Sequence, residues 1–473
     1  MRMYNTLTKR EEELKLGKTV RVYVCGITAY DYSHIGHARS AVIFDTLRRY
    51  LEWKGHEVVY AQNFTDVDDK IVRRAVAEEK TQKEIAEKFI AEYFRDMEAL
   101  NVKRATYHPK VTEHIPDIIN AVKKLVEKGF AYEVGEKNKD VYFHVPSFPH
   151  YGELSGMSLD ELNRHRIEPD ERKRDVKDFA LWKAAKDEDI KAKAVFESPW
   201  GLGRPGWHIE CSVMATRYLG VPFDIHGGGK DLIFPHHENE RAQSYALYGV
   251  EPVRYWIHND FVTIRGEKMS KSLGNIVRIK DVLKKKSGEV LRYFLLSAHY
   301  RSPLDYSDGA IERAEKAYIA LRNTLELIDM EIAALKTFGA KDVEKSGELN
   351  DATLRLLNNF KEAMEDDFNT PKAIAALHDF STSANKLVNE GNVSLDELEV
   401  AFKKFSELCG ILGIFADYRR IPPLSTEQAE LVKERELARK ERDFEKADKI
   451  REEFRSKGYA LIDTPRGTRW KLI

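Results

Sequence analysis

Two histidines, His34 and His37, flank an Ile-Gly pair in the sequence HIGH. Imidazole N–H groups donate hydrogen bonds to phosphate oxygens, and the N–H groups at the start of a helix favour negative charge at the same place. Gly36 leaves room for a nucleotide base or ribose close to the backbone. These residues predict a site that binds nucleotide phosphates. Two histidines alone are more often core or surface filler, so the prediction depends on its context.

Two lysines, Lys268 and Lys271, lie in the sequence KMSKS, after a strand-like segment and a turn at Arg265 and Gly266. Ammonium groups on such a loop can hold the β- and γ-phosphates of ATP and stabilise the charge of departing pyrophosphate. A solvated charged loop without a ligand is the alternative.

Two cysteines and a His- and Glu-rich segment offer metal-ligand side chains. Cys25 precedes HIGH, Cys211 ends WHIEC, and PHHENE contains His236 and Glu240. If Pro235 begins a helix, His236 and Glu240 lie at i and i+4 and project from one face. Two thiolates, an imidazole and a carboxylate form a four-ligand set suited to zinc. The alternative is a pair of inert buried cysteines beside a polar helix cap.

The order of apolar segments indicates which elements position these motifs. Residues 19–25 (TVRVYVC) are typical of a buried strand, residues 33–55 have apolar side chains at helical spacing, and VVYAQNFTD is typical of a second strand. Strand, loop, helix and strand form the βαβ unit of a doubly wound parallel α/β sheet, whose ligands lie at the carboxyl ends of strands. The sequence therefore predicts a Rossmann-type catalytic domain.

Further along the chain, this alternation of strands and helices changes twice. Residues from about 110 to 200 contain short strand-like pieces and a charged run, which indicate an insertion, and long amphipathic helical segments begin near Ser307. Pro422-Pro423 marks a linker before a basic helix pair and a short strand-like end. We expect a catalytic domain over 1–300, a helical domain over 301–422 and a C-terminal region over 423–473.

Composition narrows the function classes. The 473 residues include 77 basic and 78 acidic ones, so any nucleic-acid surface must be local. No apolar stretch approaches the roughly 20 residues that span a bilayer, and the Met-Arg-Met-Tyr start lacks the apolar core of a secretory signal. Three cysteines, the third being Cys409, suit a reducing compartment. We expect a cytoplasmic protein with no membrane partner.

HIGH and KMSKS, in this order and each after an expected strand, resemble the signature sequences of class I aminoacyl-tRNA synthetases. With Cys25, WHIEC at residues 207–211 and FDIHGGGKDLIFPHHENE, they make the chain similar over nearly its whole length to the cysteinyl-tRNA synthetases. The resemblance implies ATP-dependent ligation of L-cysteine to tRNA(Cys) through a cysteinyl adenylate. It also implies that the helical domain, with EDDFNTP at residues 365–371, binds tRNA. We expect a monomer.

The same resemblance implies the residues of a metal and amino-acid site. One zinc ion per chain would coordinate the substrate thiol as thiolate, a bond that serine cannot reproduce. Asp231 or a backbone carbonyl would take the substrate ammonium. The implied zinc ligands are Cys25, Cys211, His236 and Glu240, and the residues implied to line the cysteine pocket are Gly26, Thr65, Trp207 and Asp231.

ATP, with Mg²⁺, would lie at the two signature sequences. The resemblance implies ATP binding by His34, Gly36, His37 and Lys271. Catalysis would consist of positioning and of stabilising phosphate charge. The residues implied to do so are His34, His37, Lys268 and Lys271.

The C-terminal segment offers contacts for an anticodon loop. Its candidates for stacking and base-edge hydrogen bonding are Asp463, Arg466, Thr468, Arg469 and Trp470. The basic residues of the preceding helix pair lie among acidic ones, so they form either an RNA surface or a salt-bridged helix face.

Two other functions remain open from the sequence. A relative that joins activated cysteine to an amino sugar would share the motifs, but it gives no reason for a basic helix pair and aromatic tail after Pro423. A zinc-stabilised RNA-binding protein without catalysis gives no reason for intact HIGH and KMSKS sequences.

Overall fold

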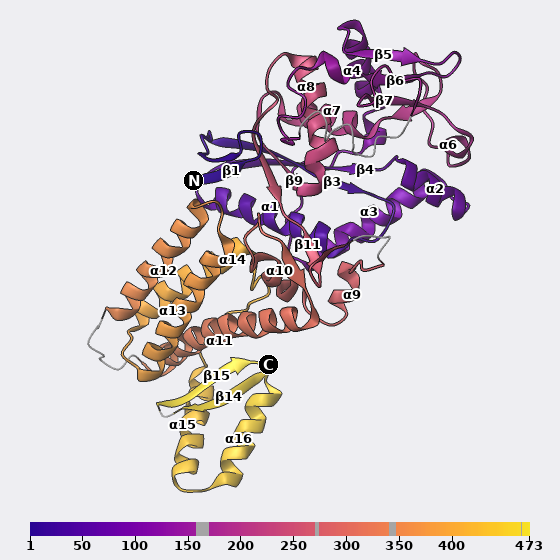
Figure 1. The fold of residues 1–473 in the computed structure, drawn as a ribbon. Coiled ribbons are helices and arrows are strands. Elements are labelled where there is room, and N and C mark those ends of the chain that lie inside the picture. Colours follow the sequence, from indigo (N-terminus) through magenta and orange to yellow (C-terminus); the bar gives the residue numbers. More distant parts are fainter. Residues whose placement is uncertain (158–169, 270–273, 340–346, 465) are drawn as a thin grey trace. The chain divides into compact units, whose positions relative to one another are not determined.

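The computed structural model describes residues 1–157, 170–269, 274–339, 347–464 and 466–473 (Figure 1). The chain forms two compact units. The first comprises Met1–Ser307 and Asp366–Phe368, and the second comprises Asp308–Glu365 and Asn369–Ile473. Among the described helices, none is long and apolar enough to cross a bilayer.

A four-stranded parallel sheet in the order β10-β9-β3-β4 lies at the centre of the first unit. Its strands are β3 (Thr19–Thr28), β4 (Glu57–Thr65), β9 (Phe223–Gly229) and β10 (Val253–Asn259). Strands covered on both faces are near-continuous apolar runs, and the consecutive residues Val22, Tyr23 and Val24 of β3 are accordingly all buried. The sheet confirms the predicted doubly wound, Rossmann-type class.

Helices cover both faces of this sheet (Figure 1). Helix α1 (Ile35–Trp53) connects β3 to β4, whereas α8 (Glu238–Tyr248) connects β9 to β10 in the opposite direction along the sheet. Because parallel crossovers are right-handed, the two helices lie on opposite faces. Helix α7 (Trp207–Leu219) packs against α8. The helix expected over residues 33–55 is therefore confirmed as α1.

A second, antiparallel sheet interrupts the βαβ pattern, as the sequence predicts. It has the order β5-β6-β7-β8 and follows three helices. These elements are α2 (Asp69–Ala77), α3 (Gln82–Ala99), η1 (Val111–Glu113), α4 (Ile115–Glu127), β5 (Ala131–Val134), β6 (Asp140–Phe143), η2 (Val145–Ser147), β7 (Phe179–Ala184), α6 (Asp187–Lys191) and β8 (Gly203–Pro205).

Smaller elements complete the first unit. Strands β11 and β12 form an antiparallel pair that leads into KMSKS, and β13 pairs with β11 in parallel. The remaining elements are β1 (Arg2–Asn5), β2 (Arg10–Glu13), η3 (Lys230–Leu232), η4 (Ile233–His237), β11 (Val262–Ile264), β12 (Glu267–Lys268), α9 (Ile279–Leu283), α10 (Gly288–Leu296) and β13 (Leu304–Tyr306).

The second unit is mostly helical, as predicted. Helices α11 to α14 pack on one another, and a helical hairpin and a β-hairpin follow. The elements are α11 (Asp308–Phe338), α12 (Glu348–Glu365), α13 (Thr370–Glu390), α14 (Leu395–Leu412), α15 (Thr426–Lys440), α16 (Phe444–Ser456), β14 (Tyr459–Thr464) and β15 (Gly467–Leu472). The three-part division at 300 and 422 stays a prediction.

Trp470 corrects one expectation for the C-terminal segment. Its side chain is fully buried in a cluster with Met330, Val432 and Phe454, and its Nε1 donates to Pro422 O at 3.0 Å. The ring therefore fills the core of the second unit and is not exposed for stacking on a base. Sequence could not separate the two uses, because an aromatic side chain serves either purpose.

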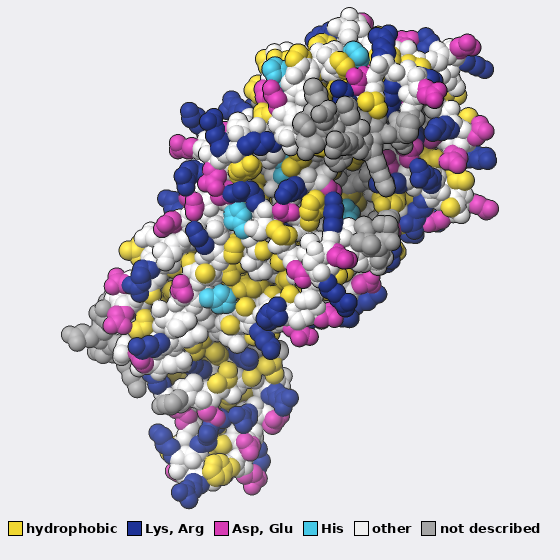
Figure 2. Space-filling model, viewed as in Figure 1, with side chains coloured by type: hydrophobic (Ala, Val, Ile, Leu, Met, Phe, Trp, Pro, Cys, Tyr) yellow, Lys and Arg dark blue, Asp and Glu magenta, His cyan; other side chains and the backbone are white. Residues whose placement is uncertain are grey.

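Basic side chains of the C-terminal helix pair form ion pairs. On the face in Figure 2, Lys and Arg side chains are interspersed with Asp and Glu. Arg435 pairs with Asp463 at 2.7 Å, and Lys446 pairs with Glu434 at 2.6 Å. For these residues the structure favours the salt-bridged helix face over a row of unpaired cations.

Candidate active site and metal centre

A cavity of about 740 Å³ opens at the carboxyl ends of the parallel strands of the first unit. It brings together most of the residues that the sequence predicts for the ATP, amino-acid and metal sites. Its lining includes Cys25, Gly26, His34, Gly36, His37, Thr65, Trp207, Cys211, Asp231, His236 and Lys268. Glu240 lies behind Cys25, and Lys271 lies outside the described residues.

The chain turns into this cavity at Gly26. A register shift between Val24 and Ile27 interrupts the pairing of β3 with β4. A Cβ atom at Gly26 would lie 1.6 Å from Asn63 O, so the two strands can approach here only with glycine. Gly26 N–H donates to Asn63 Oδ1 at 2.9 Å. This close approach sets Cys25 at the wall of the cavity.

His34 and His37 form the N-terminal cap of α1. His34 N donates to His37 Nδ1 at 3.3 Å, and His37 N donates to His34 Nδ1 at 3.4 Å. Their rings stack with centroids 3.7 Å apart. The reciprocal cap therefore holds two imidazoles at a helix N-terminus that lines the cavity, where phosphate binding is favoured.

The first residues of KMSKS lie beside HIGH. A Cβ atom at Gly36 would be 3.3 Å from Met269 Cε, and Lys268 Nζ stands 3.9 Å from the ring centroid of Phe261. Ile35 N–H also donates to Val277 O at 3.0 Å, which ties the chain after KMSKS to the start of α1. His34, Gly36 and His37 of HIGH and the described residues of KMSKS, Lys268 and Met269, thus line the same cavity.

Cys25, Cys211, His236 and Glu240 have ligand atoms that all lie within 4.8 Å of one another. The two sulfurs are 3.9 Å apart, Cys25 Sγ is 3.5 Å from Glu240 Oε1, and His236 Nε2 is 2.9 Å from the same oxygen. Ligands of a tetrahedral zinc ion lie roughly 3.3–3.8 Å apart. Small side-chain shifts would let these four close on one ion, so the donor set fits zinc.

In the absence of metal, electrostatics favours the metal-binding forms of two members of this group, Cys211 and Glu240. The hydrogen bond with Cys25 lowers the pKa of Cys211 to about 6, whereas burial raises the pKa of Cys25. Burial also opposes charge on Glu240, but His236 and His226 outweigh it and hold the pKa of Glu240 well below its usual value. A thiolate and a carboxylate are the species that coordinate metal.

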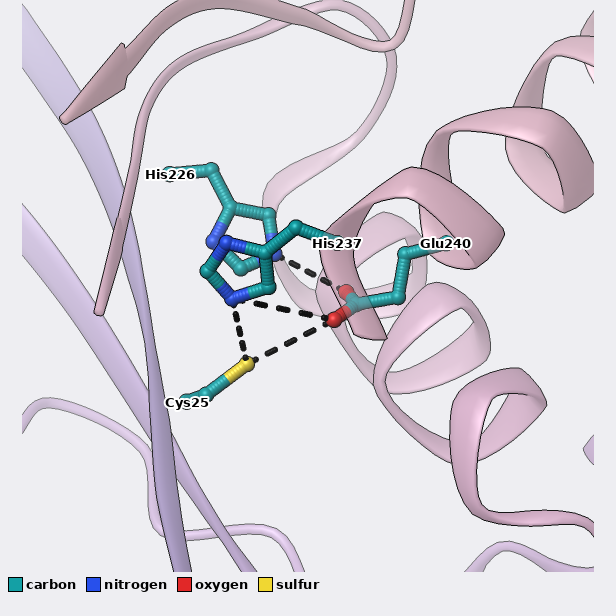
Figure 3. A group of neighbouring side chains, drawn as sticks. All are labelled: Cys25, His226, His237 and Glu240. Atoms are coloured by element: carbon teal, nitrogen blue, oxygen red, sulfur yellow. Dashed lines mark hydrogen bonds and ion pairs between the residues drawn. The ribbon is translucent and has the colours of Figure 1, made fainter. Parts of the chain in front are cut away.

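A second group that could hold a metal shares two of these residues. Figure 3 shows His226 and His237 facing Cys25 and Glu240. His237 Nδ1 contacts His258 Nε2 at 2.7 Å, and its Nε2 lies 3.3 Å from Cys25 Sγ. The first group supplies two sulfurs, and three of its members line the cavity. We therefore favour it and place His226 and His237 behind it.

Three histidines behind the ligands were not predicted from sequence. His208 Nδ1 lies 2.9 Å from His236 Nδ1, so His236 Nε2 faces Glu240. His226 Nε2 lies 2.9 Å from Glu240 Oε2. His258 contacts His237, as above. Such outer contacts orient metal ligands. The available signal for His208 and His226 was their place in two segments already singled out, WHIEC and FDIHGGG, whereas His258 lies in WIHND, which was not singled out.

The local helix around His236 differs from expectation. Helix α8 begins at Glu238 and not at Pro235, and a π turn over Ile233–His237 precedes it, with Phe234 in an extended conformation. His236 and Glu240 nevertheless converge. The i and i+4 spacing therefore predicts the proximity of this pair, although α8 does not begin at Pro235.

The predicted amino-acid pocket residues line the same cavity as three members of the metal group. Trp207 is 38% exposed, which excludes a core aromatic, and its ring stacks on His236 with centroids 4.3 Å apart. Asp231 lies in η3 at the end of β9, and Thr65 ends β4. All three line the cavity beside the metal group.

Comparisons with known proteins agree with this fold and site. Residues 12–316 match the tRNA synthetases class I (C) catalytic domain, and residues 359–416 match the DALR domain. A Mycobacterium tuberculosis methionyl-tRNA synthetase structure with methionyl-adenylate shares the fold, with a TM-score of 0.59 and 18% identity over 84% of this chain and 90% of that chain. The chain is thus of the class I tRNA synthetase fold.

Close relatives specify the family. A cysteine–tRNA ligase of Archaeoglobus fulgidus is 66% identical over the full length of both chains. The cysteine–tRNA ligase of Thermococcus onnurineus is 50% identical over all of this chain and 99% of its own. This chain belongs to the cysteine–tRNA ligase family, as its signature sequences predict.

Proposed function

We propose that the chain activates L-cysteine with ATP and transfers it to tRNA(Cys). The observation that carries this proposal is a single cavity with HIGH and the first lysine of KMSKS on one wall and a Cys-Cys-His group, backed by Glu240, on another. The first set suits adenylate formation, and the second suits recognition of a thiol. An RNA-binding protein without catalysis gives no reason for the first set.

The reaction has two transfer steps. The cysteine carboxylate attacks the α-phosphorus of ATP, which enters as its Mg²⁺ complex, and pyrophosphate leaves. A terminal ribose hydroxyl of tRNA then attacks the adenylate carbonyl, loses its proton, and AMP leaves. No covalent enzyme intermediate is needed, so the chain contributes positioning and charge stabilisation.

Phosphate charge is stabilised from both signature sequences. His34 and His37 donate from the start of α1, and Gly36 leaves room for the nucleotide against the backbone. Lys268 and Lys271 neutralise the charge that develops on pyrophosphate. Gly36 lies close to Met269, which supports the joint action of the HIGH histidines and the KMSKS lysines on one ATP.

One zinc ion per chain is held by Cys25, Cys211, His236 and Glu240. When bound, zinc supplies a bond to the substrate thiolate that a serine hydroxyl does not match. Shape alone separates side chains of similar size by only about 1–3 kcal/mol. The buried contacts of His208 and His226 keep the ligands oriented.

The remainder of the amino acid lies between the metal group and HIGH. Gly26, Thr65 and Trp207 line this space, and Asp231 or a backbone carbonyl accepts from the ammonium group. The helical domain binds tRNA and the C-terminal region contacts the anticodon, with the domain edges near 300 and 422. The enzyme acts as a monomer in the cytoplasm.

Cysteine-dependent exchange of pyrophosphate into ATP tests the first step. Wild-type protein is expected to exchange with cysteine and not with serine, and His37→Ala is expected to lower the rate by roughly 100-fold. Exchange that proceeds without cysteine, or equally with serine, would count against the proposal.

A further inference from the structure

Glu210 is a buried carboxylate that the proposed reaction does not use. It lies between Trp207 and Cys211 in the first turn of α7, and only 1% of the residue is exposed. Its Oε2 accepts a hydrogen bond from Thr65 Oγ1 at 3.2 Å. A buried carboxylate is costly to the fold, so this position beside the cavity calls for a compensating role.

Three hydrogen bonds run in one direction toward Glu210. Gly26 N–H donates to Asn63 Oδ1 at 2.9 Å, which fixes the amide so that Nδ2 donates to Thr65 Oγ1 at 3.4 Å. Thr65 uses its single hydroxyl proton to donate a hydrogen bond to Glu210 Oε2. Glu210 closes this series as the final acceptor.

This arrangement sets the polarity of Thr65 toward the cavity. A hydroxyl has one proton and two lone pairs. The Thr65 hydroxyl directs its proton to Glu210 Oε2 and one lone pair to Asn63 Nδ2. Its oxygen can therefore only accept a hydrogen bond from a ligand in the cavity that Thr65 lines. An ammonium group is such a donor, and a carboxylate is not.

We propose that Glu210 is a positioning residue, which presents the Thr65 hydroxyl as an acceptor to the α-ammonium group of the substrate. This inference rests on the proposed function, because Thr65 lines the pocket assigned to cysteine. An ammonium group has three donors, so Thr65 acts beside Asp231 and does not replace it. The acceptor role holds for the carboxylate, and for the neutral acid when its proton is on Oε1.

The test is Glu210→Gln, which keeps the shape but can turn an amide N–H toward Thr65. In cysteine-dependent ATP–pyrophosphate exchange, KM for cysteine is expected to rise about tenfold while kcat stays within about threefold. Two inhibitors separate recognition of the ammonium group from recognition of the rest of the substrate. Inhibition by cysteamine, which keeps the ammonium, should weaken by a similar factor, whereas inhibition by 3-mercaptopropionate, which lacks it, should stay within about twofold. Equal weakening of both, or of neither, overturns the proposal.

Two further variants isolate the role of Thr65. Thr65→Val is expected to produce the same selective loss, and adding Glu210→Gln to it should change KM by less than about twofold, because Glu210 acts through Thr65. Additive effects would contradict this.

Glu238→Gln is the matched control. Glu238 is also fully buried and two residues from a proposed metal ligand, but its Oε2 accepts from Ser155 N–H and not from a cavity residue. It should leave the KM for cysteine within about twofold. Wild-type protein without any cysteine-dependent exchange would count against the proposed function itself, whereas normal exchange with an unaltered Glu210→Gln KM would count only against this inference.

Discussion

The four proposed zinc ligands come from separate parts of the sequence and meet in one small buried volume. Cys25 comes from β3, Cys211 from α7, and His236 and Glu240 from the chain between β9 and β10. Each ligand depends on the others, since removing one donor leaves the rest to hold a cation with an incomplete set. Metal content and thiol recognition should therefore change together.

Cys211→Ser tests this dependence. The variant is expected to lose its zinc and to raise the KM for cysteine roughly 100-fold, because a neutral hydroxyl is a much weaker ligand than a thiolate. Metal analysis of the purified protein and the exchange assay measure the two effects separately. Cys409→Ser, a change at a fully buried cysteine of α14, should retain both. Full cysteine affinity in a metal-free Cys211→Ser protein would contradict the account.

At the scale of single residues, the sequence indicates the candidate metal ligands better than it indicates the residues that contact them. Cys25, Cys211, His236 and Glu240 stand out because thiols, imidazoles and carboxylates in signature segments have few common uses. His208, His226 and His258 were missed, because their contacts are made through space between α7, β9 and β10 and no sequence spacing reports them.

Among the elements, strands β3 and β4 decide where the cavity opens. Their pairing is regular up to Val24 and shifts before Ile27, and Gly26 fits between them only because it has no side chain. The hydrophobic pattern predicts both strands and α1 from residue types. It does not predict the register shift, which depends on backbone packing against Asn63.

Gly26→Ala tests the role of this close approach. The added methyl group would lie 1.6 Å from Asn63 O, so the strands must separate, at a cost of about 1–3 kcal/mol in the free energy of unfolding. Cysteine-dependent exchange should fall by at least about tenfold, because Cys25 and Asn63 shift with the backbone. Thermal unfolding and exchange are measured in parallel with Gly17→Ala, whose methyl group would meet only an ordinary contact at 3.7 Å. Equal behaviour of the two variants would refute the steric argument.

Across the whole molecule, adenylate chemistry and the C-terminal elements belong to different compact units. In the second unit, Arg469 is buried against Glu331, with Nε 2.6 Å from Oε2, and joins β15 to α11. The sequence predicts the helical character of this unit from its periodicity. It misassigns Trp470, because burial of the final strand depends on contacts with α11 and the linker at Pro422.

Arg469→Ala tests this separation of tasks. It leaves Glu331 buried with a weaker partner in Arg466, and losing one member of a buried pair costs about 3–5 kcal/mol. We expect kcat/KM for tRNA to fall by roughly tenfold or more while cysteine-dependent exchange stays within about twofold. Arg455→Ala, at a side chain that is 70% exposed, is the control and should alter neither assay. A parallel loss in both assays would show that the tasks are not separated in this way.

Transfer of radiolabelled cysteine to tRNA(Cys), in the presence of ATP, is the decisive measurement for the proposed zinc-dependent ligation of cysteine. The reaction is run beside radiolabelled serine and beside enzyme stripped of metal by a chelator. We expect charging with cysteine alone, loss of charging on metal removal, and recovery of charging when zinc is returned. Cysteine-dependent pyrophosphate exchange without any transfer to tRNA would contradict it and would favour a small-molecule acceptor.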